Sequence, residues 1–236
     1  MRGVRDLVGG SAKWILVALA LFWGGCVHAQ TQVYLLRGWF GVFSTGLDTM
    51  AEELRGKGIR AEAVGHLAWR STVSKLVRER EAGKTVRVVL IGHSQGGNNV
   101  IDIARELEAR KIPVDLLITL APWLQDPVPA NVVRAVNYYQ SGGWGSPLTA
   151  VPGFKGELSN IDLANDQSTF HTNIDKNPRI QAEIVRTISA LNAAGVPRPV
   201  RPETQASPPA APTQADPPPA SAEAGTPPAE SGPVSR

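Results

Sequence analysis

The sequence predicts an α/β fold with a mainly parallel sheet of about six strands and helices on both faces. Three observations lead to this class. Between residues 30 and 196, short apolar segments alternate with amphipathic ones. The apolar segments are almost continuously hydrophobic, as in strands that are covered on both faces. The connections between segments are too short for a large cap domain.

The six strand candidates are runs of aliphatic, β-branched and aromatic residues bounded by turn formers. They cover residues 32–40, 59–64, 85–92, 114–122, 132–139 and 156–163. The run "TVRVVLIG" at 85–92 gives the strongest signal, and "GELSNIDL" at 156–163 gives the weakest. Helical segments separate most of these runs, which favours parallel pairing.

The helix candidates place apolar residues at helical spacing. They cover residues 45–58, 71–81, 97–111 and 178–195. Gly58 and Gly195 stand where a glycine commonly ends a helix. The segment at 97–111 is strongly amphipathic and begins shortly after a strand and a serine, so it marks a strand, turn and helix unit.

Residues 1–29 differ from this core. Positive charges, an uncharged apolar stretch at 14–27 and a final group of small residues have the layout of a signal peptide that is cleaved after Ala29. Retention as a membrane anchor is the alternative. In both cases we expect an exported protein, periplasmic or secreted. Cys26 is the only cysteine, so the mature chain has no disulfide.

Residues 197–236 are rich in Pro, Ala, Ser and Gly. Such a segment buries too little apolar surface to offset its ordering entropy, so we expect a disordered tail. The tail serves as a spacer or, alternatively, makes a weak contact with the cell wall or a partner. Between residues 30 and 196, basic and acidic residues nearly balance, which argues against nucleic-acid binding.

The segment "GHSQG" lies between the strongest strand and the amphipathic helix. Gly92 and Gly96 permit a sharp turn because neither has a Cβ. Ser94 at its tip then exposes its hydroxyl beside the helix N-terminus, where backbone N–H groups stabilise negative charge. This pattern resembles the nucleophile elbow of the α/β-hydrolase superfamily, in particular of small serine esterases and lipases without a lid. A glycine-rich turn with an incidental serine is the alternative.

The resemblance implies a histidine base that follows the serine and the acid in the chain. His171 comes after the last strand candidate and before the last helix, and is therefore the expected base. His66 is expected to line the pocket or to cap a loop. His93 is next to Ser94, on a turn so tight that neighbouring side chains diverge.

The acid departs from the family pattern. Its usual place follows the strand at 132–139, but that segment, "QSGGWGSPL", contains no Asp or Glu. Asp126 is favoured, because some related hydrolases place the acid one strand earlier, and Asp162 ranks second. Asp166 and Asp175 follow, and a site without an acid also stays open.

The resemblance also implies an oxyanion hole. Its donors by position are the backbone N–H groups of Trp39 and Gln95, and Arg37 stands where the family has a histidine. Several apolar side chains are candidates to line an acyl or alcohol site. They are Trp39, Phe40, Trp123, Trp144, Leu148 and Phe154.

These features predict a serine hydrolase that cleaves carboxylic esters, or thioesters, through an acyl-enzyme. The substrate is expected to be a small or lipid-like ester, and no metal or organic cofactor is needed. Acyl transfer to an alcohol is one alternative. The other is a non-catalytic binding protein on a hydrolase scaffold.

Overall fold

A computed structural model of the chain describes residues 30–39, 41–42, 44–85 and 87–194. The expected leader at 1–29, the tail at 197–236 and Phe40 lie outside the described residues. One six-stranded sheet has the order β2-β1-β3-β4-β5-β6, and each neighbouring pair is parallel. Its strands are β1 (Thr31–Arg37), β2 (Arg60–Gly65), β3 (Arg87–His93), β4 (Leu116–Leu120), β5 (Arg134–Tyr139) and β6 (Glu157–Asp162). The predicted α/β class and all six strands are confirmed.

Four α-helices accompany the sheet in the described part of the chain. They are α2 (Gly46–Gly56), α3 (Trp69–Glu81), α4 (Gln95–Glu108) and α5 (Pro178–Ala193), and two short 3-10 helices are η1 (His66–Ala68) and η2 (Ile174–Lys176). Each α-helix coincides with a predicted segment to within a few residues at either end. An all-parallel sheet with helices around it fits a compact α/β-hydrolase fold.

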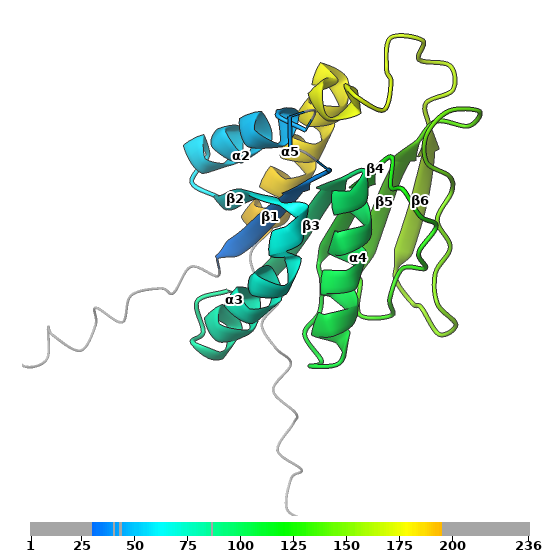
Figure 1. Ribbon diagram of the computed structural model, residues 1–236. Helices are drawn as coiled ribbons and strands as arrows, with labels where there is room; N and C mark the ends of the chain where they lie inside the picture. Colours follow the sequence, from blue (N-terminus) through cyan, green and yellow to red (C-terminus); the bar gives the residue numbers. More distant parts are fainter. Residues whose placement is uncertain (1–29, 40, 43, 86, 195–236) are drawn as a thin grey trace, which may run out of the picture. The chain divides into compact units, whose positions relative to one another are not determined.

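The helices form two layers, with α2 and α5 on one face of the sheet and α3 and α4 on the other (Figure 1). The alternation of side chains along each strand produces these layers. In β1, for example, Val33 and Leu35 pack toward α2 and α5, whereas Tyr34 and Leu36 pack toward α3 and α4. The continuous apolar character of the strands is therefore explained by a core on each side of the sheet.

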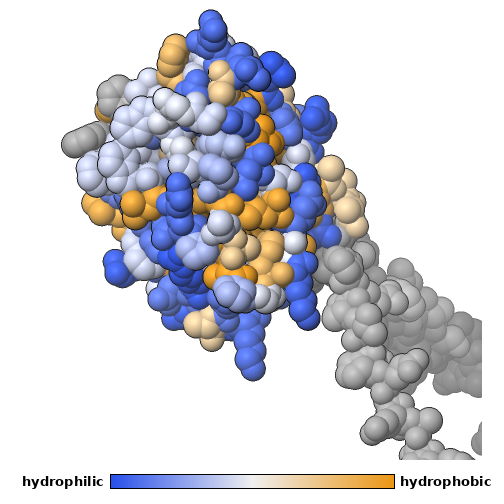
Figure 2. All heavy atoms as spheres, turned by 90° about the vertical axis from the view of Figure 1, so that its right-hand side faces the viewer, coloured by the Kyte–Doolittle hydropathy of each residue, from blue (hydrophilic) through white to orange (hydrophobic). Residues whose placement is uncertain are grey.

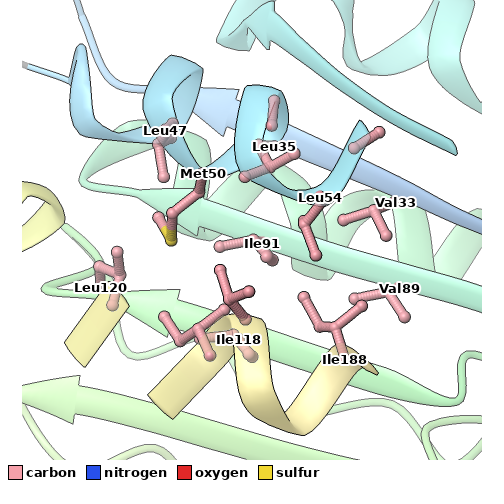
Figure 3. Close-up of a cluster of buried hydrophobic side chains, with 14 of the residues drawn as sticks. Val33, Leu35, Leu47, Met50, Leu54, Val89, Ile91, Ile118, Leu120 and Ile188 are labelled. Atoms are coloured by element: carbon pink, nitrogen blue, oxygen red, sulfur yellow. The ribbon is translucent and has the colours of Figure 1, made fainter. Parts of the chain in front are cut away.

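Figure 3 shows the core beneath α2 and α5. Met50 and Leu54 of α2 and Ile188 of α5 pack with residues of the central strands, among them Val89 and Ile91 of β3. Each of these side chains is almost completely buried. Burial of one such side chain contributes about 1.5–3 kcal/mol, so the two helices are held mainly by this contact.

The outer surface is mixed. Seen from the side on which β6 forms the edge, hydrophobic patches lie between hydrophilic side chains (Figure 2). None of the helices in the described part of the chain combines the length and apolar character needed to cross a membrane.

The turn from β3 to α4 requires glycine at two positions. A Cβ on Gly92 would overlap the backbone of Gly96, and a Cβ on Gly96 would overlap the carbonyl oxygen of Leu36 in β1. The start of α4 thus lies directly against β1 and β3. The predicted reason for the two glycines is confirmed, and the contact with β1 adds a tertiary constraint to it.

We expect Gly96→Ala to lower the free energy of unfolding by about 3 kcal/mol or more, because the overlap is with backbone atoms that cannot rotate away. The control is Gly56→Ala at the end of α2, where nothing lies within 4 Å of the added Cβ. Its effect should stay within about 1 kcal/mol. Urea denaturation measures both, and equal stabilities would contradict the tight contact at Gly96.

Candidate active site

Ser94 occupies the tip of the turn between β3 and α4. Its backbone has φ 56° and ψ −125°, a region that residues other than glycine rarely adopt. Such a conformation costs of order 1–3 kcal/mol and is concentrated at functional sites. The Ser94 N–H donates to the Leu120 carbonyl of β4 at 2.9 Å, which fixes the turn to the sheet. The structure therefore presents Ser94 as expected for a nucleophile elbow.

The described structure brings His171 to Ser94. The distance from His171 Nε2 to Ser94 Oγ is 3.0 Å, although 77 residues separate the two in the chain. His171 lies in the loop between β6 and η2, the position that the sequence predicted. Burial lowers the pKa of its imidazole, which favours the neutral ring, and a neutral ring can accept a hydrogen bond from the Ser94 hydroxyl at Nε2.

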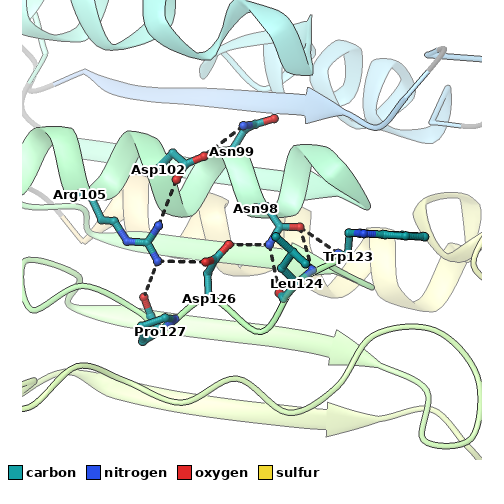
Figure 4. A network of polar contacts seen from close by, with 8 residues as sticks. All are labelled: Asn98, Asn99, Asp102, Arg105, Trp123, Leu124, Asp126 and Pro127. Atoms are coloured by element: carbon teal, nitrogen blue, oxygen red, sulfur yellow. Dashed lines mark hydrogen bonds and ion pairs between the residues drawn. The ribbon is translucent and has the colours of Figure 1, made fainter.

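His171 Nδ1 is buried and has no hydrogen-bond partner among the described residues. The expectation that Asp126 reaches this nitrogen does not match the structure. One Asp126 carboxylate oxygen accepts from Asn98 Nδ2 at 2.7 Å, and the other lies 3.3 Å from Arg105 (Figure 4). Because both partners belong to α4, Asp126 fastens the loop after β4 to that helix.

Asp162 does not reach His171 Nδ1 either. Its Oδ1 accepts from the Ser141 N–H at 3.0 Å and the Ala164 N–H at 2.9 Å, so it joins the loops that follow β5 and β6. Asp166 accepts hydrogen bonds from Ser168, Thr169 and Asn177.

Asp175 is the fourth candidate for the acid. It is fully buried, and its Oδ2 accepts from the Gly46 N–H at the start of α2 at 2.8 Å. Burial raises its pKa to about 6. Asp175 thus holds η2 against α2, and no hydrogen bond joins it to His171 in the described structure.

An aromatic ring lies next to the His171 ring. The loop after β5, where the family pattern would put the acid, brings the Trp144 ring to 4.5 Å from the His171 ring, centroid to centroid. Two side-chain amides hold this loop: Asn137 Nδ2 donates to the Ser146 carbonyl at 2.9 Å, and Asn160 Oδ1 accepts from the Leu148 N–H at 2.8 Å. The His171 ring therefore packs on an indole.

The predicted oxyanion donors line the same cavity as Ser94. Gln95 begins α4, so its N–H has no partner within the helix. Trp39 follows β1, and the N–H of the residue before it, Gly38, donates to Ser44 Oγ at 3.0 Å. Arg37 makes a paired contact with Asp48 of α2. That contact shows how this loop is held without the family's histidine.

A cavity of about 180 Å³ lies over Ser94. Three tryptophans on its lining form a row that starts at His171: Trp144 is 5.3 Å from Trp123, and Trp123 is 6.4 Å from Trp39, between ring centroids. About half of each indole is exposed. The expectation for Leu148 and Phe154 was wrong, because both pack with the core beneath α3 and α4.

A second cavity, of about 580 Å³, adjoins the first, since Gly38 and Trp39 line both. Gly41, His66 and Leu67 also line it. His66 therefore lines a pocket, as expected. That pocket is the second cavity, which shares Trp39 with the cavity over Ser94. Leu67 is one of the most exposed apolar side chains of the described residues, at 84%.

Sequence reasoning missed two polar residues of the site. His93 was expected to diverge from the pair, but its Nε2 lies 2.7 Å from the carbonyl oxygen of His171. Its Nδ1 lies 2.8 Å from Ser44 Oγ. The second residue is Ser44. Its only signal in the sequence is that it is a small polar residue shortly before α2, and this does not reveal that it contacts His93, 49 positions away. Within the described ranges, no cluster of three or more His, Cys, Asp or Glu side chains is arranged to hold a metal ion.

No protein-family model matches the sequence, and no curated protein sequence matches it significantly. The chain is similar to solved structures at low identity. Est1E from Butyrivibrio proteoclasticus is 12% identical with a TM-score of 0.46, and the match covers 71% of this chain and 90% of that one. RedJ, a thioesterase of prodiginine biosynthesis in Streptomyces coelicolor, is 11% identical with a TM-score of 0.48 over 80% and 98% of the two chains. A hydrolase of the α/β superfamily from Xanthomonas campestris is 18% identical with a TM-score of 0.38 over 69% and 98%.

Proposed function

We propose that this chain is a serine hydrolase that cleaves carboxylic esters through an acyl-enzyme. The observation that carries this proposal is the 3.0 Å distance between Ser94 Oγ, on a strained turn, and Nε2 of a half-buried histidine. A serine hydroxyl is a weak nucleophile at neutral pH and needs such a base to lose its proton. The strained backbone holds the hydroxyl at the edge of the cavity, where a substrate carbonyl has access to it.

The reaction follows from this geometry. Ser94 Oγ attacks the carbonyl carbon of the ester while its proton passes to His171 Nε2. The tetrahedral oxyanion accepts hydrogen bonds from the N–H groups of Trp39 and Gln95. Collapse breaks the bond to the alkoxy group, which takes the proton from Nε2 and leaves as the alcohol. Water then gives one proton to Nε2 and attacks the carbonyl carbon of the acyl-Ser94. Collapse of this second intermediate breaks the bond to Ser94 Oγ, which takes the proton back from Nε2, and the acid is released. A thioester is cleaved in the same way, with a thiol as the leaving product.

The row of tryptophans supports an apolar substrate. The cavity over Ser94 is small, but the adjoining cavity beyond Trp39 extends the apolar surface toward Leu67. An acyl chain that starts at Ser94 would cross Trp39 and cover these exposed side chains. Each CH₂ group that leaves water contributes about 0.8 kcal/mol, so this route favours esters of medium-length acids.

We expect Ser94→Ala to abolish turnover of p-nitrophenyl butyrate, because no other described hydroxyl has the same contact with His171. The far-UV circular dichroism should stay unchanged, since the substitution removes one oxygen atom. The control is Ser74→Ala, an exposed serine on α3. A fluorophosphonate probe should label the wild type and Ser74→Ala but not Ser94→Ala. Turnover by Ser94→Ala, or a wild type that resists the probe, would overturn the proposal and favour a binding protein.

Asn substitutions at the two favoured acids should leave catalysis nearly intact. A carboxylate that orients the base contributes up to about 10⁴-fold to kcat. Because neither side chain reaches His171, we expect Asp126→Asn and Asp162→Asn to keep kcat within about tenfold of the wild type. Asp126→Asn should instead cost about 1 kcal/mol of stability through the weakened bonds to Asn98 and Arg105. A loss of 10³-fold or more in either variant would assign that residue as the acid.

The acyl route is tested by a series of p-nitrophenyl esters from acetate to octanoate. We expect kcat/KM to rise with chain length, and Leu67→Ser to reduce the octanoate-to-acetate ratio by about tenfold. The control is Val133→Ser, which removes another exposed apolar side chain, at the residue before β5. An unchanged ratio in Leu67→Ser would place the acyl chain elsewhere.

A further inference from the structure

Two buried polar side chains lie beside the catalytic pair and take no part in the chemistry described above. Ser44 is 1% exposed and His93 is 2% exposed. The N–H of Gly38 donates to Ser44 Oγ at 3.0 Å, Ser44 Oγ lies 2.8 Å from His93 Nδ1, and His93 Nε2 lies 2.7 Å from the His171 carbonyl oxygen. These hydrogen bonds form one continuous series from the loop after β1 to the loop that carries His171.

The direction of each hydrogen bond follows from the groups at the two ends. A carbonyl oxygen only accepts, so His93 Nε2 must carry the hydrogen that it shares with His171. In a neutral imidazole the other nitrogen is then an acceptor, so the Ser44 hydroxyl donates to Nδ1. Ser44 Oγ is left to accept from Gly38. Burial, together with repulsion from His171, lowers the pKa of His93 to about 4, which keeps the ring neutral in this tautomer.

Both ends of this series of hydrogen bonds lie at groups that matter for the proposed reaction. At one end, Gly38 precedes Trp39, whose N–H is a proposed oxyanion donor. At the other end, the bond is to the main chain of the base itself. In the described structure His171 has no hydrogen bond at Nδ1, so its ring is placed by Ser94, by packing on Trp144 and by the position of its own backbone.

We propose that His93 and Ser44 are positioning residues, which hold the backbone of His171 so that Nε2 stays within reach of Ser94 Oγ. This inference rests on the proposed hydrolase function. His93 supplies by a bond to the main chain what a carboxylate would supply by a bond to the ring. Ser44 fixes the tautomer of His93 and, through Gly38, ties the base to the oxyanion loop.

Two substitutions of His93 separate this role from simple packing. The amide nitrogen of Gln reaches the place of histidine Nε2, so His93→Gln keeps a donor for the His171 carbonyl and loses the contact with Ser44. The shorter amide of Asn matches the place of Nδ1, so His93→Asn keeps the contact with Ser44 and loses the bond to His171. Both variants replace the ring with an amide, and each is the control for the other.

We expect His93→Asn to lower kcat for p-nitrophenyl butyrate about 100-fold, as a displaced base does, with KM within about threefold of the wild type. His93→Gln should keep kcat within about tenfold. Ser44→Ala removes the hydroxyl in the hydrogen-bonded series that lies farther from His171, so its kcat should fall less than that of His93→Asn. Thermal unfolding of both His93 variants should be similar, since a role in packing alone would be lost equally in the two.

Equal losses of kcat in His93→Gln and His93→Asn, or a normal kcat in His93→Asn, would overturn the inference. The imidazole nitrogen resonances give a second measurement that does not need turnover. In the wild type, His93 should appear as the tautomer protonated at Nε2. The His171 resonances should shift more in His93→Asn than in His93→Gln, because both variants remove the His93 ring beside His171 but only His93→Asn also loses the bond to its carbonyl. Should the wild type neither hydrolyse esters nor react with fluorophosphonate, the hydrolase function fails; identical His171 resonances in the two variants would then overturn the positioning role separately.

Discussion

Ser94 keeps a positive φ because the backbones of four elements meet at the turn around it. Gly92 of β3 lies against Gly96 of α4, Gly96 lies against the Leu36 carbonyl of β1, and the Ser94 N–H is bonded to Leu120 of β4. No relaxed turn fits these contacts, so the packing of the sheet and α4 supplies the energy that holds the strained residue. The same packing sets the positions of the loops after β1, β3 and β4, which surround the cavity.

The loops after β4 and β5 are held by side-chain amides. Asn98 in the first turn of α4 accepts from the N–H groups of Trp123 and Leu124 and donates to Asp126 (Figure 4). Asn137 and Asn160 bond to each other and to the backbone of the loop that carries Trp144. An amide both donates and accepts, so one side chain satisfies several backbone groups of an irregular segment. Trp123 and Trp144 therefore lie on loops that these amides hold in place.

The surroundings of His171 differ from those of a base that is paired with a carboxylate. An indole lies against one side of the ring, and a second histidine bonds its carbonyl oxygen. Among the described residues no carboxylate is hydrogen-bonded to the Nδ1 atom of this ring. In the proposed reaction, the stabilisation of the imidazolium would therefore come from the proposed oxyanion donors and from the fixed geometry of the pair.

The sequence alone determined the elements of this fold, because periodicity, glycine stops and the length of apolar runs are local properties. The run at 85–92 and the segment "GHSQG" were sufficient to locate the turn at Ser94, and the order of elements along the chain was sufficient to single out His171. Only the tertiary structure decided the partners of the polar side chains. Asp126 was a reasonable acid by its place after a strand, but Asn98 and Arg105 of α4 lie closer to it than His171 does. Leu148 and Phe154 turned inward rather than toward the cavity. The bond between His93 and the His171 carbonyl joins residues 78 positions apart, and such a contact depends on how the loops pack, which no local pattern records.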